Sequence, residues 1–451
     1  GRIVSWDNGI NPKGKAAKFS SKMSESEVRA KLTKLGFYNN KKKIIETKEQ
    51  KAAKEKQQTM SSAVLLSQPV VIDNGTAILK AGFAGGDRPS VIFDSICGRV
   101  KHERVMPGGA LEGVDVVIGD ACRKHRGALV LSRPMESGRV TDWADAERVW
   151  AHAYNMIEAS YDGHPLLMTE APLNPDSNRE KCAEVLFEHL GVPALHIAPQ
   201  AALSLYAGGR TTGLVLDIGD GVAQAVPVYE GLALRSAVVR SEVGGRAISK
   251  RLELLLRRAG FHAQTSAEKE VVREIKEQCC YVSADASRDE HAMSAALARK
   301  GALPSQNLAD AQPRSFKLPD GSHVRLEGER FRASEALFDP SVIGSEEPGA
   351  AELVALACRR ADLDLRATLY ESVVLAGGST LFPGFGERLV KDLRSKLDEG
   401  PTIRVRAPPE RALSCWIGGS ILASLATFKS MWVLRSEYDE HGAAVFSRGA
   451  L

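Results

Sequence analysis

The spacing of apolar residues changes near residue 69 of this chain. Up to that point the sequence is polar and rich in lysine, whereas beyond it short β-branched runs alternate with amphipathic stretches. The runs predict strands at residues 70–73 and 166–169, and the amphipathic stretches predict helices at 145–160 and 178–190. Because strands and helices alternate along the chain, the pattern predicts an α/β fold.

Residues 284–314 interrupt this alternation. The segment is rich in Ala, Ser, Asp and Arg and shows no clear apolar period, so we interpret it as a surface insertion. It ends shortly before Leu318-Pro319-Asp320-Gly321, whose composition predicts a tight turn.

The N-terminal segment, residues 1–62, has little apolar material to bury. Ser24-Glu25-Ser26-Glu27 has the spacing of a capping box, and a short helix is predicted to follow it. Val28, Leu32 and Leu35 would share one face of that helix. We predict a partly flexible extension, and a solvated tail without a specific role is the alternative.

Charge is unevenly distributed along the chain. Residues 1–60 contain 15 Lys and Arg against 6 Asp and Glu, a net charge of +9, whereas the whole chain carries +4. The rest of the chain is therefore mildly acidic. This asymmetry predicts a basic extension that can dock on an acidic partner.

The 451 residues exceed what one compact core usually holds and predict two or three domains. The seven cysteines are odd in number and lack C-x-x-C spacing, which argues against a disulfide framework or a zinc site. No apolar run reaches the roughly 18 residues that span a bilayer, and no signal-peptide pattern opens the sequence. We therefore expect a soluble protein of the cytosol or of a reducing cytoskeletal compartment.

One sequence pattern occurs twice. Residues 70–83 read VVIDNGTAILKAGF, and residues 214–231 read LVLDIGDGVAQAVPVYEG. Each run begins with an apolar strand that ends at an aspartate, Asp73 or Asp217, and continues through a glycine-containing turn into a second apolar strand. Since the two copies are far apart in the chain, the pattern indicates duplicated domains rather than a solenoid.

The residue types in these hairpins fit phosphate and metal binding. Turns with Gly75, and with Gly219 and Gly221, can direct backbone N–H groups at phosphate oxygens. The two aspartates supply the few carboxylates that Mg²⁺ takes when it keeps water and phosphate ligands, and Lys80 adds a positive charge. Either hairpin alone is more simply an ordinary β-turn, but two copies facing each other could hold one nucleotide.

A third run, residues 373–380, reads VVLAGGST. It predicts a buried strand that ends in two glycines, where the backbone can approach a flat ring closely. Together with the two hairpins, this run predicts a nucleotide site.

These motifs resemble those of the actin superfamily, which also includes sugar kinases and heat-shock ATPases. TEAPLNP at 169–175, QAALSLYAGGRTTG at 200–213 and APPERALSCWIGGSILASLATFKSMW at 407–432 are similar to actin and its relatives. GRVKHERVMPGGALEG at 98–113 is most similar to the centractin group of actin-related proteins, which form the dynactin filament. The resemblance covers about residues 66–446.

The resemblance implies an actin-like fold with a nucleotide cleft between two domains. After the extension at 1–62, a small domain would span 63–199 and a large domain would span 200–413, including the insertion at 284–314. Residues 414–451 would return to the small domain. The implied cofactors are ATP or ADP with Mg²⁺ or Ca²⁺.

By motif, the resemblance assigns residues to each part of this cleft. Asp73 and Asp217 would hold the metal through water, and Gln200 and Gln224 would order the attacking water. For Lys276 and Glu277, spacing alone favours a solvated helix face. The nucleotide-binding residues implied by the resemblance are Asp73, Gly75, Thr76, Lys80, Asp217, Gly219, Asp220, Gly221, Val222, Gly245, Arg273, Lys276, Glu277, Gly378 and Ser379.

Four positions depart from the family pattern. Ala77 replaces a glycine of the first turn, Ile218 replaces a small polar residue, and Ala412 replaces a long side chain near the adenine. Gln224 replaces a histidine that helps to position water, and glutamine cannot gain a proton near neutral pH. We therefore expect nucleotide binding with at most slow ATP hydrolysis.

Two functions follow from the resemblance. The first is a filament subunit of a dynactin-like complex that supports dynein and microtubule-based transport, with polymer contacts at 102–113 and 331–349. The alternative is a divergent actin-related subunit of a microtubule, axonemal or chromatin assembly that does not polymerise. The basic extension and the insertion favour the alternative, whereas a metabolic kinase fits poorly because no stretch resembles a sugar-binding loop.

The implied partners are further copies of the chain and other cytoskeletal subunits. Dynein, dynactin or microtubules would contact the N-terminal extension, while neither a membrane span nor a nucleic-acid motif is expected. The expected location is the cytoplasm and cytoskeleton, with a cilium, flagellum or centrosome region as further options.

Overall fold

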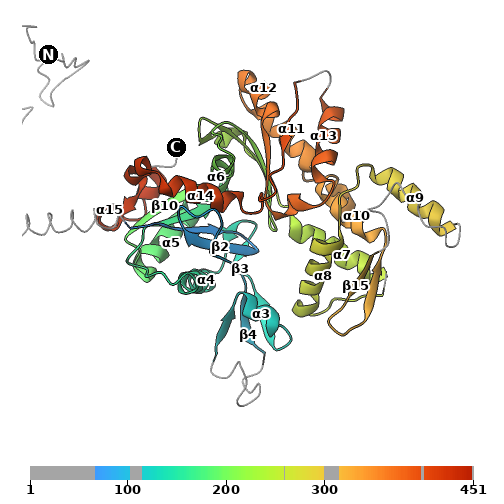
Figure 1. Ribbon diagram of the computed structural model, residues 1–451, viewed down its shortest axis with the longest axis horizontal. Coiled ribbons are helices and arrows are strands. Elements are labelled where there is room, and N and C mark those ends of the chain that lie inside the picture. The colour runs from blue at the N-terminus through green and yellow to red at the C-terminus, as the bar shows by residue number, and fades with distance from the viewer. Residues whose placement is uncertain (1–66, 102–113, 259, 299–313, 398–400, 449–451) are drawn as a thin grey trace, which may run out of the picture. The chain divides into compact units, whose positions relative to one another are not determined.

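The computed structural model describes residues 67–101, 114–258, 260–298, 314–397 and 401–448 (Figure 1). Within the chain, Ser61–Leu451 form one compact unit. The predicted N-terminal helix and the predicted polymer contact at 102–113 lie outside the described residues.

The first half of this unit is built on a six-stranded mixed sheet in the order β19-β10-β9-β1-β2-β3. Its centre is β1, which pairs antiparallel with β2 and parallel with β9, and all of its residues are buried. The strands are β1 (Val70–Asn74), β2 (Ile78–Phe83), β3 (Val91–Asp94), β9 (Leu166–Glu170), β10 (Ala194–Pro199) and β19 (Val433–Leu434).

A second sheet repeats this arrangement in the order β13-β12-β11-β17-β18, with β14 also paired to β12. Here β11 is antiparallel to β12 and parallel to β17, as β1 is to β2 and β9. The duplicated sequence pattern thus corresponds to a duplicated strand arrangement. The strands are β11 (Gly213–Ile218), β12 (Ala223–Tyr229), β13 (Leu232–Ala233), β14 (Val239–Ser241), β17 (Val373–Ala376) and β18 (Val405–Arg406).

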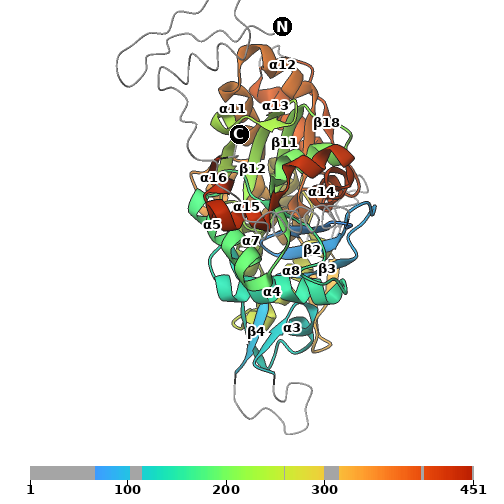
Figure 2. The same ribbon diagram turned by 90° about the vertical axis from the view of Figure 1, so that its left-hand side faces the viewer.

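Helix α6 (Gln200–Ala207) packs on both sheets, and α14 (Ser414–Ser424) packs on the first sheet and on α6. Leu203 of α6 and Trp416 of α14 pack with Val71 of the first sheet, and the Trp416 indole N–H donates to the Val71 carbonyl at 3.0 Å. On its opposite side, α6 packs Leu205 against Val215 of the second sheet. Its first residue, Gln200, therefore lines a cavity together with residues of both sheets. Figure 2 shows β11 and β12 of the second sheet above β2 and β3 of the first.

Most other helices pack into the core of one of the two sheets. Amphipathic patterns place Trp150 and Phe187 in the core of the first sheet, and Leu252 and Leu389 in that of the second. Among the described residues, no helix combines the length and the apolar character needed to cross a bilayer. The helices that share the core of the first sheet are α4 (Trp143–Met156), α5 (Asp176–Glu184), the π-helical η1 (Val185–Leu190), α15 (Arg435–His441) and α16 (Val445–Arg448), and those that share the core of the second are α7 (Gly245–Arg258), α8 (Ser266–Cys279), α10 (Glu329–Ser334), α11 (Ala350–Arg360), α12 (Leu363–Glu371) and α13 (Phe385–Lys396).

A small three-stranded sheet follows β3. It consists of β4 (Cys97–Val100), β5 (Val116–Ile118) and β6 (Leu129–Ser132), and α3 (Asp120–Lys124) packs on it. Ile96, Val117, Cys122 and Leu129 form its separate apolar core. A two-stranded ribbon, β7 (Met135–Glu136) and β8 (Arg139–Val140), leads back to the first sheet.

The predicted strands and helices are confirmed with shifts of a few residues at their ends. The strands predicted at 70–73 and 166–169 are β1 and β9, and the helix predicted at 145–160 is α4. The helix predicted at 178–190 begins two residues earlier and changes to π geometry at Val185. The α/β prediction is therefore confirmed.

The segment predicted as an insertion, residues 284–314, contains one described helix. Although its sequence shows no clear apolar period, α9 (Ala286–Ala298) is helical. Alanine favours helix without any amphipathic pattern, and the start of α9 is held by a 2.6 Å hydrogen bond from Ser283 to Asp289. Beyond it, the predicted turn joins β15 (Arg314–Lys317) to β16 (His323–Leu326), with Gly321 at φ 88°.

Candidate functional site

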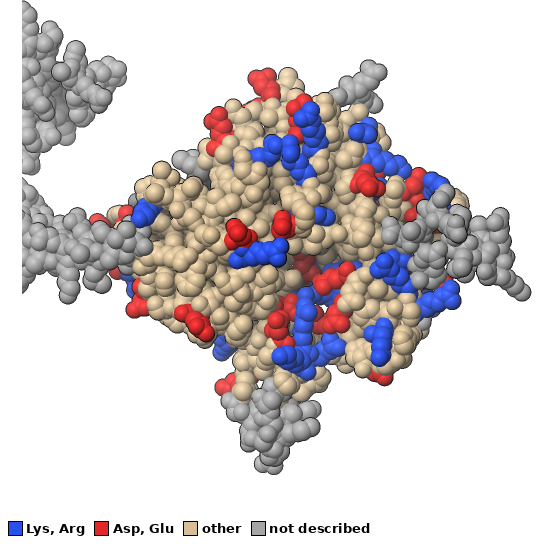
Figure 3. All heavy atoms as spheres, in the orientation of Figure 1, with Lys and Arg blue, Asp and Glu red and all other residues tan. Residues whose placement is uncertain are grey.

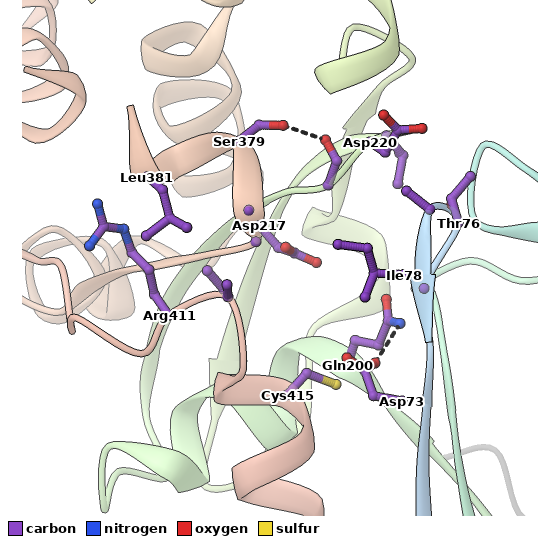
Figure 4. Close-up of a pocket in the computed structure, with 18 of the residues that line it drawn as sticks. Asp73, Thr76, Ile78, Gln200, Asp217, Asp220, Ser379, Leu381, Arg411 and Cys415 are labelled. Atoms are coloured by element: carbon purple, nitrogen blue, oxygen red, sulfur yellow. Dashed lines mark hydrogen bonds between the residues drawn. The ribbon is translucent and has the colours of Figure 1, made fainter. Parts of the chain in front are cut away.

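A cavity of about 390 Å³ lies between the two duplicated hairpins (Figure 4). Its size is within the usual range of small-molecule sites. Gly221, Gly245 and Gln224 of the predicted site do not line it. The predicted residues that line it are Asp73, Gly75, Thr76, Lys80, Gln200, Asp217, Gly219, Asp220, Val222, Arg273, Lys276, Glu277, Gly378 and Ser379.

Each hairpin places one residue opposite its aspartate. In the first hairpin Asp73 pairs with Lys80, and in the second Asp217 pairs with Gln224 at the equivalent position. The Lys80 ammonium donates to Asp73 Oδ2 at 2.6 Å, and the Gln224 amide donates to Asp217 Oδ2 at 3.1 Å. One aspartate is therefore paired with a cation and the other with a neutral amide.

This difference separates the pKa values of the two aspartates. Burial alone would raise the pKa of Asp73, but the Lys80 charge and hydrogen bonds from Lys80, Thr169 and Cys415 hold it below its usual value. Burial raises the pKa of Asp217 to about 6, which the hydrogen bond from Gln224 offsets only in part. A bound cation would lower it again, because positive charge favours the ionised carboxylate.

Gln200 begins α6 directly after Pro199 and reaches the floor of the cavity. Its amide Nε2 donates to Asp73 Oδ1 and to Thr169 Oγ1, both at 3.3 Å, and Figure 4 shows the first of these contacts. Thr169 in turn donates to Asp73 Oδ1 at 2.9 Å. These contacts hold the Gln200 amide beside the first aspartate.

Gln224 lies behind Asp217 instead of on the cavity wall. Its side chain is fully buried, and its Oε1 has no hydrogen-bond partner among the described residues. A buried amide oxygen without a partner lowers the stability of the folded state, which opposes the gain from the hydrogen bond that Nε2 donates. Through Nε2 it orients the Asp217 carboxylate.

The double-glycine run closes on the second hairpin. Gly377 has φ 81°, and a Cβ there would lie 2.4 Å from Asp217 Oδ1 and 2.3 Å from the Ile218 carbonyl oxygen. Only glycine therefore allows the end of β17 to approach Asp217. One turn later, Ser379 Oγ donates to the Gly219 carbonyl at 2.8 Å (Figure 4).

Helix α8 contributes charged residues to the cavity. A capping box at Thr265 and Glu268 begins the helix. Lys276 is only 5% exposed and donates to the Gly245 carbonyl at 2.9 Å, and burial lowers its pKa. The solvated face that spacing favours is thus wrong for Lys276, whereas the side chain of Glu277 is 51% exposed.

Sequence reasoning missed several wall residues. Ser204, one turn after Gln200, could have been found from helical spacing, and Leu381, Phe382 and Pro383 directly follow the double-glycine run. These three side chains and Ala412 add apolar surface to the cavity wall, and Arg411 lies beside Leu381 in Figure 4. Gly138, Arg411 and Cys415 were also missed, whereas Asn74, Ala77, Ile78, Ala376 and Gly377 lie within the predicted motifs without an assigned binding role.

The sequence profile of the actin family matches residues 65–450. This chain belongs to the actin family. A relative from Neurospora crassa described as "Actin-like protein" is 47% identical over 379 residues, which cover 84% of this chain and 97% of the relative. The predicted actin-like fold is thereby confirmed, as is the resemblance to actin-related proteins.

The cavity of this actin-family protein fits a nucleotide with a hard metal ion. The described residues contain no group of three or more His, Cys, Asp or Glu side chains that could hold a metal by themselves. Asp73 and Asp217 fit an ion such as Mg²⁺, which keeps water and takes phosphate oxygens as its other ligands. The apolar part of the cavity wall fits a flat ring, and the hairpin turns fit its phosphates.

Proposed function

We propose that this chain binds ATP or ADP with Mg²⁺ or Ca²⁺ in the cavity between its hairpins. The observation that carries the proposal is that two copies of one hairpin bring Asp73, Lys80 and Asp217 to a single cavity from two sheets. The phosphates would lie at the turns, with the metal between the two carboxylates. The nucleoside would lie among the residues of α8 and of the run after β17.

Hydrolysis would be slow in this proposal. Gln200 is held at the cavity floor, where its amide can order water beside Asp73. Gln224 acts only through Asp217 and offers no group that titrates near neutral pH. Bound metal would supply charge stabilisation at the phosphates, while Lys80 is already engaged by Asp73.

The proposed domain division follows from the sheets. A small domain at 63–199 and a large domain at 200–413 would each contain one hairpin, and residues 414–451 would return to the small domain. The pairing of β19 with β10 supports that return.

At the level of assembly, we propose a cytoskeletal filament subunit similar to the centractin group, in a dynactin-like complex that supports dynein and microtubule transport in the cytoplasm. The support is the sequence resemblance at 98–113 together with membership of the actin family. A non-polymerising subunit of a microtubule, axonemal or chromatin assembly is the second candidate. The basic extension at 1–60 favours it, because this extension lies outside the region that matches the actin family.

Two experiments test these statements separately. Equilibrium binding of a fluorescent ATP analogue, competed by ATP in the presence of Mg²⁺, tests the nucleotide site. Absence of saturable binding by the native chain would contradict that part. Sedimentation of the full chain with Mg-ATP tests assembly, since filaments or short rods support the first candidate and a strict monomer supports the second.

A further inference from the structure

One buried ion pair joins the two halves of the structure beside the cavity, at its wall residue Arg273. Asp94, the last residue of β3, accepts a hydrogen bond from the Arg273 guanidinium of α8 at 2.9 Å. The Asp94 side chain is 3% exposed and that of Arg273 is 9% exposed. Because the partners come from the first and second halves of the unit, separating the halves must break this contact.

Asp94 and Arg273 are each held by further charges. Asp94 also accepts from Arg123 of α3, and Arg273 also donates to Glu270 at 3.2 Å and to Glu277 at 2.9 Å. Although burial opposes ionisation of both groups, their opposite charges lower the pKa of Asp94 and raise that of Arg273. Both groups are therefore charged at neutral pH.

Two more ion pairs join α8 to the first half of the unit. Arg133, just after β6, donates to Glu270 at 2.9 Å, and Arg126, just after α3, donates to Glu274 at 3.2 Å. Figure 3 shows acidic and basic side chains mixed in the region where α3 and α8 face each other. The α8 partners of these three ion pairs lie within about one helical turn: Glu270, Arg273 and Glu274.

The same helix lines the cavity. Arg273, Lys276 and Glu277 are wall residues, so one stretch of α8 faces the cavity while it bonds to the opposite half. The second strand of the first hairpin is also attached to Asp94, because its first residue, Ile78, is paired with Asp94 across β2 and β3. Asp94 thus connects the first hairpin to the cavity wall of α8.

We propose that Asp94 is a positioning residue for nucleotide retention, which fixes the wall residue Arg273 from the other half of the unit and keeps the two halves together around the ligand. Release of the nucleotide then requires that the Asp94–Arg273 pair and its two neighbouring ion pairs separate. Removing one partner leaves the other charge buried and unpaired, which strongly disfavours the closed arrangement. The inference rests on the proposed nucleotide site.

The test is the dissociation rate of a fluorescent ATP analogue from the full-length protein, chased with excess ATP and Mg²⁺. Asp94→Asn is expected to speed release by about tenfold or more, and Asp94→Glu is expected to recover part of the native rate. The matched control is Asp87→Asn, which changes an exposed aspartate of the same half between β2 and β3. A release rate for Asp94→Asn within twofold of native would overturn the inference.

A charge exchange at a partly exposed pair gives a second test that does not depend on the buried site. The side chains of Arg126 and Glu274 are 21% and 34% exposed, so their variants are expected to fold. Arg126→Glu should speed release, and adding Glu274→Arg should slow it again. If the double variant releases no more slowly than Arg126→Glu, the inference fails. If the native chain binds no nucleotide, the proposed function fails first, which distinguishes the two results.

Discussion

Lys80 and Gln224 occupy the same place in two copies of one hairpin, yet they give their aspartates different chemistry. Lys80 supplies a full positive charge to Asp73, whereas Gln224 supplies only an amide N–H to Asp217. The first aspartate therefore stays ionised over a wide pH range, while the pKa of the second is about 6. Two variants test what this difference does.

Gln224→His is expected to increase the rate of phosphate release from ATP. A histidine at this position can hydrogen-bond to Asp217 and can also exchange a proton near neutral pH, which glutamine cannot. A group that transfers a proton directly typically changes a rate by about 10²–10⁴-fold, so a residue that acts through Asp217 is expected to change it less. The measurement is steady-state phosphate release, with Gln224→Met as the control that fills the space without donating. Phosphate release by the native protein that is as fast as, or faster than, release by Gln224→His would contradict a role for this position.

Asp217→Asn is expected to stabilise the protein without nucleotide above about pH 6. Folding raises the pKa of Asp217 above the aspartate value of the unfolded chain, so protonation of this carboxyl stabilises the folded state. This stabilisation is fully present below about pH 4 and is lost as the pH rises through about 6. Asparagine keeps the acceptor for Gln224 but carries no charge. The difference in unfolding free energy between variant and native protein should grow by roughly 1–3 kcal/mol between pH 4 and pH 7. Urea unfolding across this range measures it, and a constant difference would contradict the assignment.

At the scale of helices and strands, the contact between α6 and α14 positions two wall residues of the cavity. Gln200 begins α6, and Cys415 lies in α14. The close approach of the two helices depends on Gly418, where a Cβ would lie 1.7 Å from the Leu203 carbonyl oxygen. Sequence periodicity could not show this contact, because the apolar residues of α14 do not follow a one-sided helical pattern.

Gly418→Ala is therefore expected to destabilise the protein by about 1–3 kcal/mol or more, since the two helix backbones must move apart. It should also weaken nucleotide binding, because Gln200 and Cys415 move with these helices. Thermal melting measures the first effect. Gly386→Ala on α13 is the control, because a Cβ there meets no atom within 4 Å and alanine favours helix by up to about 1 kcal/mol. Equal melting temperatures for the two variants would contradict the packing argument.

At the scale of the whole molecule, local patterns predicted the strands, the main helices and the duplicated hairpins. They succeeded because each hairpin carries its own signal, an apolar run followed by an aspartate and a glycine turn. The contact of Asp94 with Arg273 beside the cavity could not be predicted in this way. Its partners are far apart in sequence, and each alone looks like an ordinary surface charge. The helix α9 was not predicted either, because its residues show no apolar period. It depends instead on the helix propensity of alanine and on the hydrogen bond at its start.

The central claim is that nucleotide and metal bind between the two hairpins, and a thermal melt of the full chain tests it most directly. A ligand that binds only the folded state raises the unfolding free energy by about 2.7 kcal/mol at 100 times its dissociation constant. Millimolar Mg-ATP should therefore raise the melting temperature of the native protein, while Asp217→Asn should respond much less and Asp87→Asn should respond like native. A native melting temperature that Mg-ATP leaves unchanged would contradict the account.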